Sequence, residues 1–211
     1  MSKYPMITIS REYGSNGHKI GELLSQKLGI PFYDKDVIAI AAKEAHTTER
    51  TFEEVEATAA GTTLGYAFSN RSNRDEFGMP VNDRIYYVQS SVIRTLADQG
   101  PAIFVGRCAD AVLAGYKRTI DIFLWANEET RTQTIMYREN LSHAAAEAIR
   151  KRYDKGRATY YNYYTDRKWG DLKNYDMSLN VSHLTPEEAA DLLAEFINHV
   201  VEKTDALNKP E

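Results

Sequence analysis

The 211-residue sequence predicts an α/β fold, a three-layer sandwich in which helices cover a central parallel sheet. Short apolar runs at 6–10, 102–105, 119–125 and 177–181 are separated by stretches in which apolar residues recur at helical spacing. Continuous apolar runs bounded by turn residues are typical of buried parallel strands. One domain spanning the whole chain is the natural expectation for this length.

The N-terminal part predicts strands joined by helices. The first strand leads through a glycine-containing turn into a helix at 17–28, which Gly29 ends. A short second strand follows at 32–33, and two more helices are expected at 37–42 and 48–60. This alternation is that of a parallel sheet.

Residues 61–80 differ in composition from the rest of the chain, because Gly, Thr, Ser, Asn and paired charges dominate them. We expect a mobile surface segment there, serving either as a linker or as a loop that closes over a substrate. A long helix follows at 82–99, with apolar residues on one face. Gly106 then leads into a short helix that ends at about residue 114.

The C-terminal part predicts three helices. Asn127 is expected to cap the first, whose first turn carries two glutamates where the helix dipole favours acids. A basic helical region at 142–157 is followed by a polar, tyrosine-rich stretch up to residue 176. Core packing is the default interpretation of these tyrosines, with base stacking or a subunit interface as alternatives. Thr185, followed by Pro and two Glu, starts the last helix.

Composition excludes several classes of protein. A formal net charge of −4 disfavours a general nucleic-acid or anionic-membrane binder, while leaving room for a local basic pocket that takes a small anion. Cys108 is the single cysteine, which excludes a disulfide framework, and the five histidines show no paired spacing that predicts a protein-bound metal. Because no apolar signal core or membrane-length apolar run is present, we expect a cytoplasmic protein.

The segment after the first strand resembles a P-loop in outline but departs from its motif, G-x-x-x-x-G-K-[ST]. The six-residue window that ends at Gly17 begins with Glu12 instead of glycine. His18 then stands at the lysine position, and Lys19 comes one place late. Ile20 supplies no hydroxyl for Mg²⁺.

The backbone of this segment still suits a phosphate. A glycine turn at a helix start directs several N–H groups and the positive end of the helix at one spot. Here the nest would be formed by Gly14, Ser15, Asn16 and Gly17, with side-chain bonds from the serine and the asparagine. The alternative is a plain strand–turn–helix joint in which the glycines serve only tight packing.

Five other residues are candidates for the site. Arg107 follows a buried strand at the carboxyl edge of the sheet, where it would either bind phosphate or lock the adjacent helix through a salt bridge. Arg150, Asp154 and Arg157 would either stabilise a transferring phosphoryl group or form a solvated basic face. Asp34 would hold a sugar hydroxyl or a base amine, or cap the next helix.

Several segments, in order along nearly the whole chain, resemble the cytidylate kinase-like family of P-loop nucleoside monophosphate kinases. The N-terminal phrase is ISREYGSNG, and the second-strand segment is GIPFYDK. The strand that ends in Gly-Arg is FVGRCAD, and the next strand and helix start read IFLWANEETR. The spacing of Arg150, Asp154 and Arg157 resembles the basic lid of that family, and residues 175–176 and 179–182 resemble its final strand.

This resemblance implies a P-loop nucleoside monophosphate kinase-like fold with a helical lid at 142–176. It implies ATP-dependent phosphoryl transfer to a nucleoside monophosphate or related small acceptor, with Mg²⁺ bound through the nucleotide. Residues 14–19 would cradle the phosphates of ATP, with His18 or Lys19 in the lysine role. The catalytic residues would be Arg107, Arg150, Asp154 and Arg157. Asp34 and Arg107 would contact the substrate.

The chain also departs from cytidylate kinases in ways that affect function. The P-loop lysine and hydroxyl are displaced or absent, no arginine follows Asp34 in the substrate position, and residues 61–80 do not resemble the CMP-binding region. A nucleotide-binding regulatory module without catalysis is therefore the alternative to a kinase. A third alternative is an interaction protein that uses its tyrosine-rich segment as an interface. A homo-oligomer is compatible with each of these.

Overall fold

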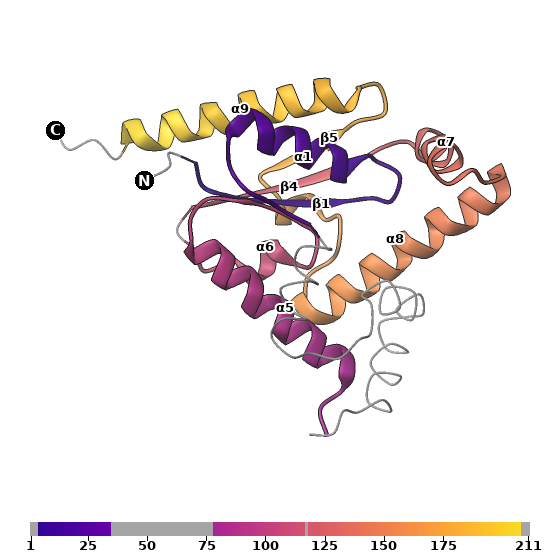
Figure 1. Cartoon of the computed structure of the whole chain (residues 1–211), viewed down its shortest axis with the longest axis horizontal. Helices are drawn as coiled ribbons and strands as arrows, with labels where there is room; N and C mark the ends of the chain where they lie inside the picture. The colour runs from indigo at the N-terminus through magenta and orange to yellow at the C-terminus, as the bar shows by residue number, and fades with distance from the viewer. Residues whose placement is uncertain (1–3, 35–77, 117, 208–211) are drawn as a thin grey trace.

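Five parallel strands form the centre of the protein, whose computed structural model describes residues 4–34, 78–116 and 118–207 (Figure 1). The strands are β1 (Met6–Arg11), β2 (Phe32–Tyr33), β3 (Ile103–Val105), β4 (Thr119–Trp125) and β5 (Met177–Asn180), in the spatial order β2-β3-β1-β4-β5. The helices expected at 37–42 and 48–60, and residues 61–77 of the expected surface segment, lie outside the described residues.

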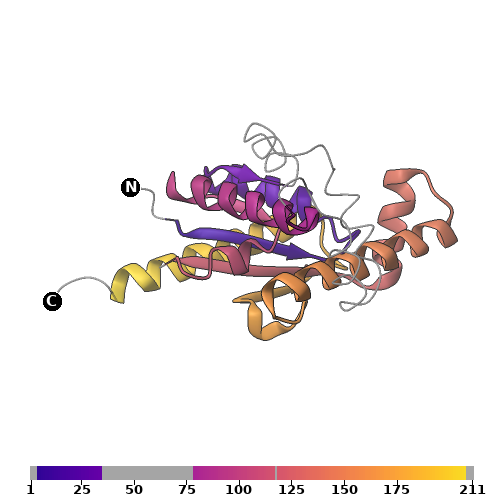
Figure 2. The ribbon, with the colours of Figure 1, turned by 90° about the horizontal axis from the view of Figure 1, so that it is seen from below.

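Helices cover both faces of this sheet, which confirms the predicted three-layer α/β fold (Figures 1 and 2). One face carries α1 (Gly17–Leu28) and α9 (Pro186–Leu207), and the other carries α5 (Val81–Asp98), α6 (Ala109–Val112) and α8 (His143–Thr165). The helix α7 (Glu128–Glu139) packs against α8, and a 3₁₀ turn, η1 (Leu172–Asn174), precedes β5. None of the described helices has the length and apolar composition of a membrane span.

Alternation along the strands divides the interior into an apolar and a partly polar half. Ile7 and Ile9 of β1 are fully buried in the core formed with α1 and α9. On the opposite face Thr8 donates a hydrogen bond of 2.6 Å to the Asp121 carboxylate of β4. Because adjacent residues of a strand point to opposite faces, this polar pair lies on the face of the sheet that is opposite to α1 and α9.

The Asp121 carboxyl gives the protein a testable pH dependence. Burial raises its pKa from 3.8 to about 6, although the Thr8 hydroxyl opposes that shift. The folded state therefore holds this proton more tightly than the unfolded state, so its stabilising contribution is full below pH 3.8 and is lost as the pH rises through 6. We expect Asp121→Asn to raise the free energy of unfolding at pH 8 by about 1–2 kcal/mol.

Urea denaturation of both proteins from pH 4 to pH 8 measures this effect. The gap between variant and parent should open between pH 4 and pH 6, the interval set by the two pKa values. Asp191→Asn is the matched control, because the Asp191 side chain is 64% exposed. A gap independent of pH would show that the carboxyl of Asp121 is not destabilised by burial.

The sequence prediction for α8 was wrong in its length. The helix continues to Thr165 instead of ending near residue 157, so most of the tyrosine-rich stretch is helical. Tyr160 and Tyr161 are almost fully buried, and Tyr164 stacks on Tyr86 of α5 with ring centroids 4.2 Å apart. Helical spacing brings these rings onto the face that packs against α5, as the core-packing interpretation predicts.

The capping contacts that the sequence predicts are present at the start of α9 and absent at the start of α7. Thr185 and Glu188 form the reciprocal capping box at α9, since each backbone N–H donates to the side chain of the other residue. Asn127 occupies the N-cap position of α7, but its side chain makes no capping bond there.

The glycine loop after β1 lies where the order of the strands in the sheet reverses. The chain leaves β1 toward β2 on one side and later returns to β4 on the other, with β3 directly beside β1. Ligands of such sheets bind at the carboxyl ends of the strands near this switch. The loop after β1 and the turn after β3 meet there.

Candidate functional site

The loop between β1 and α1 is a tight turn that needs left-handed backbone conformations. Gly14 has φ +84°, and a Cβ added to it would lie 2.7 Å from the carbonyl oxygen of Arg131. Asn16, the N-cap of α1, has φ +58° and ψ +18°. Glycine and asparagine tolerate this region best, which explains their places in the loop.

Backbone N–H groups around this turn are available to a ligand. Within the described part of the chain, no acceptor is bonded to the N–H groups of five residues: Gly14, Asn16, Gly17, His18 and Lys19. The intervening N–H of Ser15 makes a long bond of 3.4 Å to the Glu12 carbonyl, and that of Tyr13 donates to Asp154. Open donors at the start of a twelve-residue helix have the geometry and the polarity that suit an anion.

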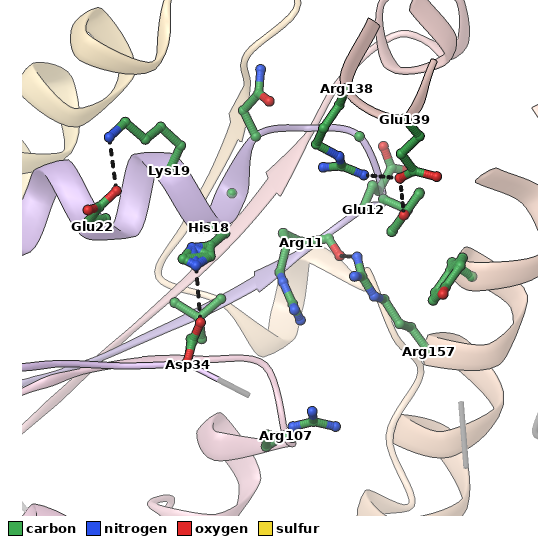
Figure 3. A pocket seen from close by; sticks show the side chains of 16 residues that line it. Arg11, Glu12, His18, Lys19, Glu22, Asp34, Arg107, Arg138, Glu139 and Arg157 are labelled. Carbon is green, nitrogen blue, oxygen red and sulfur yellow. Dashed lines mark hydrogen bonds and ion pairs between the residues drawn. The ribbon is translucent and has the colours of Figure 1, made fainter. Parts of the chain in front are cut away.

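A cavity of about 490 Å³ opens beside the loop (Figure 3). Its size suits a small-molecule ligand. The lining includes most of the residues that the sequence singled out, which are Gly14, Asn16, Gly17, His18, Lys19, Asp34, Arg107 and Arg157. It also includes residues without a predicted role, which are Arg11, Glu12, Tyr13, Glu22, Val105, Arg138, Glu139 and Tyr153.

Arg107 reaches the cavity from a strained turn after β3. Gly106, Arg107 and Cys108 have φ values of +78°, +61° and +55° in succession. Non-glycine residues rarely adopt this conformation, and each one costs about 1–3 kcal/mol. Arg107 is only 7% exposed and lines the cavity opposite the loop. A strained backbone persists only where the surrounding fold holds it in place. Such residues cluster at functional sites.

Arg157 enters the cavity from α8. Its Nη1 donates a hydrogen bond of 2.9 Å to the carbonyl of Arg11, and its guanidinium lies over the Tyr13 ring. Tyr13 in turn stacks on Tyr153 of α8, with ring centroids 4.3 Å apart. Helix α8 is therefore docked directly against the loop.

His18 and Lys19 lie on the cavity wall with acidic partners. His18 Nε2 is 3.0 Å from a carboxylate oxygen of Asp34, so two predicted site residues from α1 and the end of β2 are in contact. The Lys19 ammonium is paired with Glu22 at 2.9 Å and extends along α1, away from Arg11 (Figure 3).

Three predicted site residues lie outside the cavity lining. Ser15 is 2% exposed, and its hydroxyl donates to the carbonyl of Glu12. Arg150 is buried and donates to Glu128 of α7 at 2.7 Å. Asp154 accepts bonds from the Tyr13 N–H and from Arg131. These contacts connect the loop, α7 and α8 to one another outside the cavity lining.

Arg131, to which sequence reasoning gave no role, lies at the centre of that support. This buried α7 side chain pairs with Glu12 and Asp154, and it donates to the backbone carbonyls of Ala126 and Tyr13. Burial raises the pKa of the Glu12 carboxyl, and the charge of Arg131 opposes that shift. The sequence includes Arg131 in the segment IFLWANEETR but gives it no role, because its charged partners come from the loop after β1 and from α8.

A parallel sheet of this order, with a tight glycine loop that leads into a helix beside a cavity, is the fold of the P-loop kinases. The sequence profile of the cytidylate kinase-like family matches residues 6–183. The chain therefore belongs to the cytidylate kinase-like family.

Solved structures agree with this fold. An uncharacterized protein from Eubacterium ventriosum ATCC 27560 is 29% identical, with a TM-score of 0.72 over 93% of this chain and 99% of that chain. A gluconokinase from Sinorhizobium meliloti 1021 has 11% identity and a TM-score of 0.57, over 99% and 100% of the two chains. A shikimate kinase from Bacteroides thetaiotaomicron has 14% identity and a TM-score of 0.52, over 92% and 98%. These two kinases share the fold with this chain. Among curated proteins, none matches the sequence.

Proposed function

We propose that this protein transfers the γ-phosphoryl group of ATP to a nucleoside monophosphate or a related small acceptor. The observation that carries the proposal is the set of unbonded loop N–H groups facing a cavity into which Arg107 and Arg157 project. Family membership supports the same class of reaction.

The loop is suited to the phosphates of ATP. The N–H groups at Gly14, Asn16 and Gly17 would donate to phosphate oxygens, and the positive end of α1 would favour their charge. Side chains at Gly14 or Gly17 would collide with Arg131 or Arg11, so the narrow loop needs glycine at both positions. His18 and Lys19, at the first turn of α1, would border the same phosphates.

Arginines would stabilise the charge that moves during transfer. In this reaction the bond between the γ-phosphorus and the bridging oxygen of ADP breaks while a bond to the acceptor oxygen forms, so positioning and charge neutralisation provide most of the catalysis. Arg107 and Arg157 line the cavity from different elements, the turn after β3 and helix α8, and have planar guanidinium groups that match phosphate oxygens. Asp154 and Arg150 would act indirectly, by holding α8 against the loop and α7.

Asp34 is the candidate for acceptor binding. It lies at the carboxyl end of β2, lines the cavity and contacts His18. Its carboxylate would accept a hydrogen bond from a sugar hydroxyl or a base amine of the acceptor. Arg107, from the turn after the neighbouring strand β3, would bind the acceptor phosphate.

Magnesium would be held through the nucleotide. Within the described residues, no three His, Cys, Asp or Glu side chains are arranged to hold a metal ion. A hydroxyl is also lacking at the first turn of α1, so phosphate oxygens and water would supply the ligands of Mg²⁺. The ion would neutralise phosphate charge when bound.

Thermal unfolding with ligands tests the proposal. MgATP at 100- to 1,000-fold excess over its dissociation constant should stabilise the protein by about 3–4 kcal/mol, and adenosine should have a much smaller effect. A panel of nucleoside monophosphates, with ATP consumption as the second measurement, identifies the acceptor. Stabilisation by MgATP without consumption for any acceptor would favour the regulatory module instead. The absence of any shift would refute nucleotide binding.

A further inference from the structure

The structure changes the register in which the loop should be compared with the P-loop motif. In that motif the lysine directly follows the second glycine. The residue that ends this loop in the left-handed conformation is Asn16, and α1 begins at Gly17. Asn16 therefore occupies the place of the second glycine, Gly17 that of the lysine, and Arg11, five residues before Asn16, that of the first glycine.

The side-chain space at Gly17 is filled by Arg11. A Cβ added to Gly17 would lie 2.8 Å from both Cβ and Cγ of Arg11. A lysine at position 17 would thus extend into the volume that the stem of Arg11 already occupies. Arg11 comes from the last position of β1 instead of the helix, but its side chain runs through the same space.

The guanidinium of Arg11 continues across the cavity. A Cβ at Gly106, in the turn after β3, would collide with Nη1 of Arg11. In Figure 3 the Arg11 side chain lies between His18 and Arg157 and points toward Arg107. Glycine at 17 and at 106 therefore leaves a passage for this one side chain, from the end of β1 to the turn that carries Arg107.

We infer that Arg11 supplies the phosphate-binding cation that the P-loop lysine supplies elsewhere, an assignment that rests on the proposed nucleotide binding. The two basic side chains nearest in sequence are directed otherwise, because Lys19 pairs with Glu22 and His18 contacts Asp34. Arginine also offers a planar fork that binds two phosphate oxygens at once, which a lysine does not.

Binding of MgATP, measured by calorimetry, tests the assignment. Arg11→Met should weaken MgATP binding by roughly 10- to 100-fold, because a charged hydrogen-bond donor to phosphate is lost. Adenosine, which has no phosphate, should bind the variant and the parent alike. Lys27→Met is the control for charge, since Lys27 pairs with Asp191 at the far end of α1.

Exchange of the two positions makes the test independent of folding defects. Gly17→Lys alone should bind MgATP poorly because the new side chain meets Arg11. The double variant R11G/G17K should bind within a few-fold of the parent, because it restores the motif in the corrected register. Equal binding by parent and Arg11→Met would overturn the inference, as would a double variant that binds no better than Arg11→Gly. A parent that does not bind MgATP would refute the proposed function, and this assignment with it.

Discussion

Arg131→Met is expected to lower the free energy of unfolding by about 3–5 kcal/mol, because it leaves two partly buried carboxylates without their cation. Arg131 is 4% exposed, and it pairs with Glu12 and Asp154 while donating to two backbone carbonyls. Its loss would also release the glycine loop, so stabilisation by MgATP should disappear. Urea denaturation with and without MgATP measures both effects.

Two comparisons and a control variant show whether charge is the cause. Neutralising the stranded acids, in the triple variant E12Q/R131M/D154N, should recover part of the lost stability. The deficit of Arg131→Met should also be smaller at pH 5 than at pH 8, because burial raises the pKa of Glu12 and Arg131 no longer opposes that shift, so Glu12 takes up a proton as the pH falls. Lys151→Met, which breaks an exposed pair with Glu147, should change stability by less than about 0.5 kcal/mol. If Arg131→Met changed the free energy of unfolding as little as Lys151→Met, the central role of Arg131 would be contradicted.

Arg107→Gly is expected to reduce the rate of phosphoryl transfer by roughly 100- to 1,000-fold while leaving the fold intact. The guanidinium that would stabilise the transferring group is removed, whereas glycine accepts the left-handed backbone at this position without strain. Stability should therefore be maintained or rise by up to about 1 kcal/mol. Steady-state kinetics and urea denaturation of the same preparation measure the two properties.

Arg107→Ala is the matched variant, because it removes the same cation but retains the backbone strain. It should be as inactive as Arg107→Gly and less stable. If both variants lose stability together with activity, the salt-bridge interpretation of Arg107, in which it locks the adjacent helix, would replace the catalytic one. Unchanged phosphoryl transfer in either variant would remove Arg107 from the site.

The loop after β1 has features that its local sequence determines and one that depends on its backbone conformation. The sequence predicted a tight glycine turn and an anion site after the first strand, and the helix it predicted at 17–28 is α1. The motif places His18 at the lysine position, because the glycine nearest the start of the helix is Gly17. Only the backbone dihedral angles reveal that Asn16 ends the loop, since asparagine tolerates the left-handed conformation that the P-loop motif assigns to glycine.

What the sequence determined by itself is the local structure and its order along the chain. Apolar runs, helical spacing and glycine or proline at the boundaries depend on neighbouring residues, so β4 and α1 begin and end where the pattern predicts. Tertiary structure alone decided which side chains meet. Arg11 crosses to the turn after β3, and Arg131 reaches the loop after β1 and helix α8, because the packing of distant elements sets those contacts and no spacing in the sequence encodes them.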